Sequence, residues 1–531
     1  LQQMTENDEN PNYIPKPKQQ LTQQEENELE GRNDADFRNK VKAKLQEQVL
    51  NGSQIVLLFN LFVPQLIALL VEVICNYVSI YFQVQQYGSD YYEAALIYVS
   101  FLFIVSKYIS QAIAQMHSIK LAEMMQQNKP AEEIQDIVSY HFKAQVIIGI
   151  LLSVIGIAIS FVLPSFPTFA TYVQVSAVFV PVCTALSSSY SIVYLIENRR
   201  LLMFGLTVAK PILQLFLEVF IYSFQTTVTS SEVTTTVQTN WPTTTAVVVS
   251  NLVVAIWIVW FNHGKSALGV SNLEEFPQLK FWDWDFKKLV YSAKLLPAAI
   301  GGFSQILFYF AVIKSEINVE TTYNDPADRL KMYYQVFVFA IFGQLFRAVA
   351  VAGSSLFVQV AVANKIAENL NRINSVKIIV VLAAAVVNLL LYLLLTSMPI
   401  LQIFSNADVV GVDISQTLLF ITIAGFGQVI TEICTAQSVI DGKWLLVVII
   451  PVVKLVQILI VDNYATTEIG DGADYAMMLF FTEISSVGAG LLIIIVDILL
   501  KILEMKRIEK IKGKKKVNKH RNIGELLAGL K

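Results

Sequence analysis

A short passage that occurs twice in this chain constrains its fold more than any other feature. Residues 195–202, with the sequence LIENRRLL, recur as residues 439–446, with the sequence VIDGKWLL. At the same offset Lys210 corresponds to Lys454, so a base inside an apolar run recurs as well. Repetition over such a distance predicts an internal duplication of one structural unit.

The composition places this unit in a membrane. Apolar residues make up 54% of the chain and charged residues 15%, and the mean hydropathy is +0.54. These values exclude a soluble globular protein of this length. Apolar stretches long enough to cross about 30 Å of hydrocarbon predict an all-α integral membrane protein with twelve transmembrane helices. The spans lie near 54–82, 92–115, 142–164, 172–197, 201–224, 245–262, 289–314, 331–358, 376–398, 411–440, 444–463 and 474–502.

Basic residues alternate between the predicted loops. One set of loops contains Lys or Arg, for example at Arg199, Lys265 and Lys443, whereas the opposite set is almost free of them. The loop over 315–331 carries two basic residues but is acidic overall. Because cytoplasmic loops collect Lys and Arg, we expect a multi-pass protein with both termini in the cytoplasm. The sequence does not indicate which membrane it occupies.

Both copies of the repeated passage fall in predicted cytoplasmic loops. The two halves therefore have the same orientation, and an axis along the membrane normal relates them as parallel repeats. This arrangement predicts two six-helix lobes with a central cavity between them. The predicted domains are a disordered cytoplasmic tail (1–50), an N-terminal lobe (51–264), a cytoplasmic interlobe linker (265–288), a C-terminal lobe (289–502) and a basic cytoplasmic tail (503–531).

Polar residues inside the first predicted helix mark a candidate binding site. Glu72, Asn76 and Ser79 lie on one narrow helical stripe, and ionisable groups in a bilayer are costly unless they face a cavity or a partner. The stripe either lines a cavity or forms interhelical hydrogen bonds, and both interpretations stay open.

Basic residues also occur within the predicted spans. Lys107 and Arg347 lie in corresponding helices of the two lobes. Lys210 and Lys454 are about 15 Å from their cytoplasmic helix ends, which is too deep for easy snorkelling. Each base needs an acidic partner, and a structural salt bridge and a role in substrate or proton binding are both open. The candidate partners are Glu72, Glu218, Glu432, Asp462 and Glu483.

Other chemistry finds little support in the sequence. The three cysteines lie in apolar spans, and the four histidines show no metal-ligand spacing. A phosphate-binding glycine loop is absent from the sequence. We therefore expect no enzyme, no metal site and no direct use of ATP, and a secondary transporter becomes the leading hypothesis.

Several segments resemble those of one transporter family. Residues 399–409 (PILQIFSNADV), residues 362–364 (VAN), Gly442, Pro64 and Pro297 look like motifs of the multidrug and toxic compound extrusion (MATE) family. This family belongs to the multidrug/oligosaccharidyl-lipid/polysaccharide exporter (MOP) superfamily. The resemblance covers most of the membrane-spanning part and also includes the order of the motifs and the two parallel lobes.

The resemblance implies alternating access and export of organic compounds, driven by inward flow of H+ or Na+ and without another cofactor. The helix 1 aspartate of the family would fall near Ser79, and the helix 7 glutamate of its eukaryotic members would fall at Gln305, which cannot titrate. Glu72, Glu432 and Glu483 remain as candidate coupling acids.

Three functions are compatible with the sequence. The first is a MATE-type antiporter that exports small organic solutes or xenobiotics, and the buried bases favour anionic or zwitterionic cargo over cations. The second is a flippase of anionic lipid-linked cargo, in which the bases would bind phosphate. The third is a transport-inactive structural subunit of a membrane complex. The expected partners are membrane lipids, a small organic solute and, for the third function, other subunits, but no nucleic acid.

Overall fold

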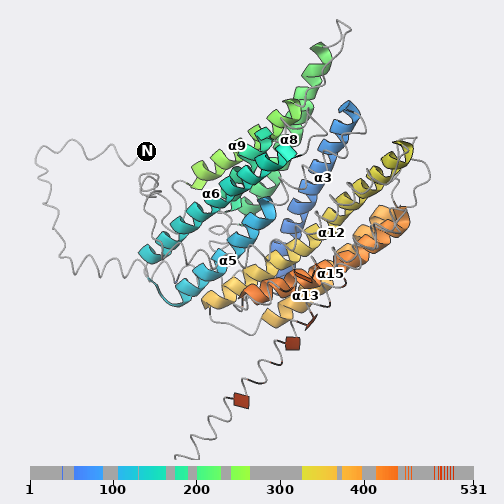
Figure 1. The fold of residues 1–531 in the computed structure, drawn as a ribbon. Helices are drawn as coiled ribbons and strands as arrows, with labels where there is room; N and C mark the ends of the chain where they lie inside the picture. Colours follow the sequence, from blue (N-terminus) through green and yellow to red (C-terminus); the bar gives the residue numbers. More distant parts are fainter. Residues whose placement is uncertain are drawn as a thin grey trace, which may run out of the picture.

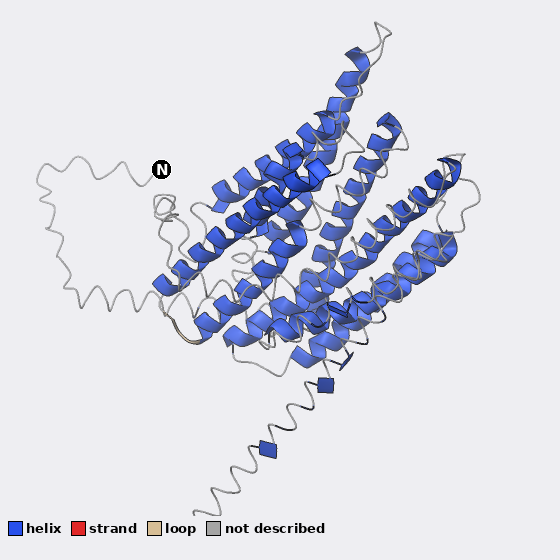
Figure 2. Ribbon diagram, in the orientation of Figure 1, coloured by secondary structure: helices blue, strands red, loops and turns tan. Residues whose placement is uncertain are grey.

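The computed structural model describes nine segments of the chain and isolated positions outside them. The segments are 53–87, 106–129, 131–162, 174–188, 200–228, 241–262, 326–367, 373–397 and 414–440. These segments form helices and no strand (Figure 2). The predicted all-α fold class is confirmed in the described part of the chain.

The first predicted helix consists of three continuous pieces. They are α2 (Gln54–Leu57), the π-helical turn η2 (Leu58–Phe62) and α3 (Val63–Tyr87). The Ser53 side chain caps the N-terminus by accepting a hydrogen bond from the backbone N–H of Val56 at 3.2 Å. Pro64 follows the π-helical turn directly. Because proline has no N–H to donate to the preceding turn, it is compatible with such a local departure from α-helical bonding.

The described part of the N-terminal lobe also contains a shorter apolar helix, Gln174–Ser188, and four longer helices. They are α5 (Ser106–Gln126), α6 (Ala131–Val162), α8 (Arg200–Val228) and α9 (Trp241–Asn262). Segment α8 packs against both α3 and α9, and α5 packs against α6 (Figure 1). The predicted spans in this lobe are therefore present as helices wherever the structure describes them.

The predicted boundary between the second and third spans is wrong. The prediction ended one helix at 115 and began the next at 142, but α5 continues to Gln126 and α6 begins at Ala131. Hydropathy detects the apolar layer, whereas a helix can continue beyond that layer with its backbone groups bonded. Asn128, with φ of 53°, ends α5. The N–H of Lys129 donates to the carbonyl of Met124 at 3.1 Å, as in a Schellman motif.

The C-terminal lobe is described through three long helices. They are α12 (Pro326–Ala367), α13 (Ile373–Ser397) and α15 (Ile414–Ile440). Segment α12 is longer at both ends than the predicted span 331–358. The predicted span 289–314 lies outside the described residues, and the last two predicted spans are described only at isolated positions.

The outer faces of these helices suit a lipid environment. Five described helices are long and apolar enough to cross a membrane, and three shorter helices are also apolar. Large apolar side chains on α8 and α13 are exposed, among them Phe216, Leu382 and Val386. In water such a surface would be unfavourable, but hydrocarbon solvates it readily.

One apolar core joins the two lobes. Segment α12 packs against α3, α5, α13 and α15. The core contains Phe62 from η2, Met125 from α5, Phe357 from α12 and Val429 from α15. These residues come from the helix halves that are predicted to lie on the cytoplasmic side. In Figure 1 the ribbons of α3 and α12 diverge toward the opposite end.

Candidate functional site

Polar side chains begin where the apolar core of the two lobes ends. On α3 the core extends to Leu69, and Glu72 follows within one turn. On α5 the core begins at Ala114, and Lys107 lies about two turns before it. On α12 the buried residue Arg347 directly precedes the core. On each of these three helices a charged residue therefore lies within about two turns of the apolar core.

Glu72 and Lys107 form an ion pair that joins α3 to α5. The ammonium group of Lys107 donates to Oε2 of Glu72. The side chains remain 18% exposed at Glu72 and 23% exposed at Lys107. The pair is therefore shielded enough for a substantial interaction, yet not sealed within the protein.

A second base lies close to this pair. Lys210 of α8 is within electrostatic range of Glu72, Lys107 and Cys183. Pro211 follows it inside the helix, where proline removes one backbone hydrogen bond of the preceding turn. Glu72 is thus attracted by two bases that come from different helices.

A second polar contact joins α3 to α8. The Ser79 hydroxyl donates a hydrogen bond to Oε2 of Glu218, and the exposed fractions of the two residues are 4% and 0%. Lys210, Gln214 and Glu218 are spaced by four residues and lie along one side of α8. Glu72, Ser79, Lys107, Lys210 and Glu218 are called the N-lobe polar cluster below. Its two acids balance its two bases in formal charge.

The structure brings most of the predicted N-lobe residues together. Glu72, Ser79, Lys107 and Lys210 belong to the cluster, and half-buried Asn76 lies on α3 between Glu72 and Ser79. The stripe on the first helix therefore makes interhelical contacts at Glu72 and at Ser79.

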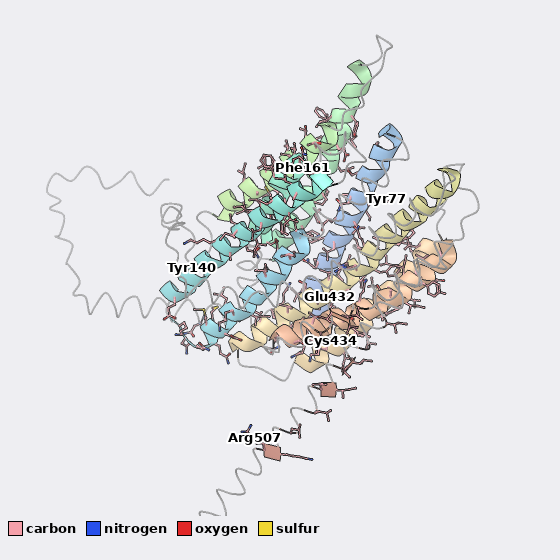
Figure 3. The ribbon with its side chains drawn as sticks, in the orientation of Figure 1. Tyr77, Tyr140, Phe161, Glu432, Cys434 and Arg507 are labelled. Carbon is pink, nitrogen blue, oxygen red and sulfur yellow. The ribbon has the colours of Figure 1, made fainter. Side chains whose placement is uncertain are left out.

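Two further predicted site residues lie on described helices of the C-terminal lobe. Arg347 of α12 is buried. Glu432, labelled in Figure 3, lies on α15 and is half-buried. Gln305, Lys454 and Glu483 lie outside the described residues.

Glu218 takes part in a contact that the sequence does not predict. It was named only as a candidate partner for a buried base, whereas its carboxylate accepts the hydrogen bond from Ser79. The available signal was the polar spacing Lys210, Gln214, Glu218, which repeats every four residues as one side of a helix does. The contact with Ser79 had no local signal, because it joins helices that are distant in sequence.

The three cysteines lie in buried positions on the helices. Cys75, Cys183 and Cys434 are buried and free of disulfides, which fits the predicted role in packing. Among the residues that the structure describes, no group of three His, Cys, Asp or Glu side chains could hold a metal ion.

The fold is similar to that of solved exporters. A MATE protein in complex with MaL6 has a TM-score of 0.64 and 14% identity, covering 86% of this chain and 98% of that chain. A MOP superfamily transporter from Pyrococcus furiosus, described as having reverse polarity of its binding pocket, has a TM-score of 0.61 and 13% identity, with the same coverage. A eukaryotic MATE transporter has a TM-score of 0.61 and 12% identity, covering 83% of this chain and 95% of that chain.

Sequence comparisons add no relative to these structures. No protein-family profile matches the chain, and the comparison with curated proteins finds no match. The structural similarity nevertheless extends over most of the chain and includes both lobes. It confirms the predicted resemblance and fold class: the chain has the fold of the MATE transporters of the MOP superfamily.

Proposed function

We propose that this protein is a secondary active transporter, a MATE-type antiporter that exports small organic solutes by alternating access. The observation that carries the proposal is the position of the N-lobe polar cluster. Charged groups lie directly beyond the apolar core that joins the lobes, within a fold whose solved examples are transporters and not enzymes.

The arrangement of the core supports alternating access. Apolar side chains of α3, α5, α12 and α15 close the end that is predicted to be cytoplasmic, and the ribbons of α3 and α12 separate toward the other end (Figure 1). A dry apolar core excludes ions, so transport requires this core to part while the other end closes.

The ion pair supports coupling to H+ or Na+. Protonation of Glu72, or binding of Na+ to its carboxylate, would cancel the charge that attracts Lys107. Lys107 would then be repelled by nearby Lys210, which favours a rearrangement of α5 relative to α3 and α8. The N-lobe polar cluster therefore contains groups that could couple a cation to this rearrangement.

The charges also bear on the cargo. Lys107 and Lys210 lie together in one lobe, and Arg347 is buried in the other. These bases would repel a cation and attract an anion, and the acids Glu72 and Glu218 beside them would attract the positive group of a zwitterion, so anionic or zwitterionic solutes fit the site better.

The test is gradient-driven transport in proteoliposomes. Uptake of ethidium, fluorescein and norfloxacin would be measured as examples of a cation, an anion and a zwitterion, with an H+ gradient, a Na+ gradient or neither. We expect uptake that requires a gradient and is lost in Glu72→Gln. The control is Glu123→Gln, whose partner Lys120 lies on the same helix and whose side chain is 33% exposed.

Other outcomes would favour the alternative functions. Uptake that needs no gradient, or is unchanged by Glu72→Gln, contradicts the antiporter. Movement of a fluorescent anionic lipid between leaflets, without solute uptake, would indicate a flippase. Absence of both activities in a folded protein would indicate a structural subunit.

A further inference from the structure

We propose that Glu72 and Lys107 belong to the substrate site and pair with each other while the site is empty. A zwitterionic solute would then replace this internal ion pair with its own two charged groups. The positive group of the solute would take the place of Lys107 on Glu72, and its negative group would take the place of Glu72 on Lys107. The inference rests on the proposed transport function and names the substrate class of that same site.

The geometry of the pair allows it to open. Glu72 and Lys107 belong to different helices, α3 and α5, so their separation requires no break in either helix. Both side chains are partly exposed, at 18% and 23%. By contrast, Lys120 and Glu123 at the far end of α5 form a pair within one helix, at 3.1 Å. The helix itself holds these two residues near each other.

The charges around the pair distinguish three kinds of ligand. A cation that takes Glu72 releases Lys107 beside Lys210, which repels it. An anion that takes Lys107 releases Glu72, which Lys210 still attracts. A zwitterion leaves neither member of the pair without an opposite charge. Because an uncompensated charge in a shielded site is costly, the expected order of affinity is zwitterion, then anion, then cation.

Matched sets of ligands test this order. One set is phenylalanine with phenethylamine and hydrocinnamate, and another is leucine with isoamylamine and isocaproate. Within a set the apolar group is the same, while the carboxylate or the amino group is missing. Binding to the detergent-solubilised full-length protein would be measured by calorimetry at neutral pH. We expect the amino acid to bind at least about tenfold more tightly than its amine, because removing one partner of a shielded charge pair costs at least that factor.

Variants of the pair should change the preferred charge in a defined direction. In Glu72→Gln the two bases remain, so the affinity for the carboxylic acid ligands should rise relative to the affinity for the amino acids. In Lys107→Gln the carboxylate of Glu72 remains, so the affinity for the amine ligands should rise relative to the affinity for the amino acids. The exchange Glu72→Lys with Lys107→Glu restores a pair and should restore the preference for amino acids. The double variant Lys120→Gln with Glu123→Gln is the matched control on α5 and should bind like the original protein.

The outcomes separate the inference from a purely structural role and from the transport function. If the pair only holds the helices together, its variants lower thermal stability without changing the order of ligands, and the inference fails. It also fails if no amino acid binds in a manner that depends on both residues. Binding needs no gradient, so a zwitterion preference without gradient-driven uptake contradicts the antiporter and leaves this binding site intact. Gradient-driven uptake without the preference contradicts only the inference.

Discussion

Ser79 of α3 donates its hydroxyl hydrogen bond to the carboxylate of Glu218 on α8, although the two residues are 139 positions apart in sequence. Both residues are buried, with exposed fractions of 4% and 0%. The contact connects two helices in the part of the N-terminal lobe that also holds Glu72 and Lys107. A carboxylate in such surroundings depends on its hydrogen-bond donors.

Ser79→Ala removes one of these donors. We expect the free energy of unfolding to fall by about 1–3 kcal/mol, because a buried acceptor loses a partner. Reversible unfolding in mixed micelles would measure the change. The matched control is Ser250→Ala on α9. Buried Ser250 donates to the carbonyl of Val247 in its own helix, so its loss should cost less than about 0.5 kcal/mol. Equal losses at the two positions would contradict this prediction.

Gly425 sets the distance between α15 and α12. A Cβ atom placed on it would lie 2.9 Å from Cβ of Phe346, which cannot move without its helix. Gly425→Ala should therefore lower the free energy of unfolding by about 1–3 kcal/mol through overpacking. Gly205→Ala on α8 is the control, since nothing lies within 4 Å of its added Cβ. Alanine favours helix more than glycine, so that variant should be at least as stable as the original protein. Unchanged stability of Gly425→Ala would show that the helices can separate freely.

Asn388 of α13 is buried in the C-terminal lobe without a hydrogen bond from its side-chain amide to any described residue. Asn388→Leu should raise the free energy of unfolding by about 1–3 kcal/mol, because an apolar side chain of similar size avoids the cost of burying the amide. Asn251→Leu on α9 is the comparison. Asn251 is also buried, but its amide donates to the carbonyl of Val247 at 2.8 Å, so the gain should be smaller. Destabilisation by Asn388→Leu would refute this interpretation.

Alternating access predicts that different residues are exposed to water in the two states of the transporter. In a background where Cys75, Cys183 and Cys434 are replaced by alanine, Asn76→Cys should react with a membrane-impermeant maleimide faster than Phe357→Cys. Asn76 is half-buried near the ion pair, whereas Phe357 is 0% exposed in the apolar core. A bound solute that drives the core open should accelerate labelling at position 357. Mass spectrometry would measure both rates, and constant slow labelling at 357 under all conditions would contradict an opening core.

The sequence predicts the positions of the membrane-spanning helices well, but it predicts the ends of these helices poorly. The spans now described as α3, α8, α13 and α15 follow from the length of their apolar runs. The ends of α5 and α6 could not be found this way. Polar residues there mark where the helix leaves the hydrocarbon, and the helix itself continues until Asn128 adopts its left-handed conformation.

The site residues were also only partly predictable. Helical periodicity placed Glu72, Asn76 and Ser79 on one stripe, and the cost of buried charge indicated that Lys107 and Lys210 need partners. Neither argument could assign those partners. Lys107 bonds an acid 35 positions away, and Ser79 bonds one at a still greater separation in sequence. Helical periodicity relates residues within one helix, so it gives no information on contacts between residues of different helices.

The sequence by itself determined that this chain is an all-helical membrane protein with charges inside its spans. Transfer of a residue into hydrocarbon depends mainly on that residue and its neighbours along the helix, so it can be summed along the chain. Only the tertiary structure decided that Glu72 pairs with Lys107 and Ser79 with Glu218, and that apolar halves of α3, α5, α12 and α15 close one end. Coulomb and hydrogen-bond energies depend on distances between helices, and those distances exist only after the helices pack.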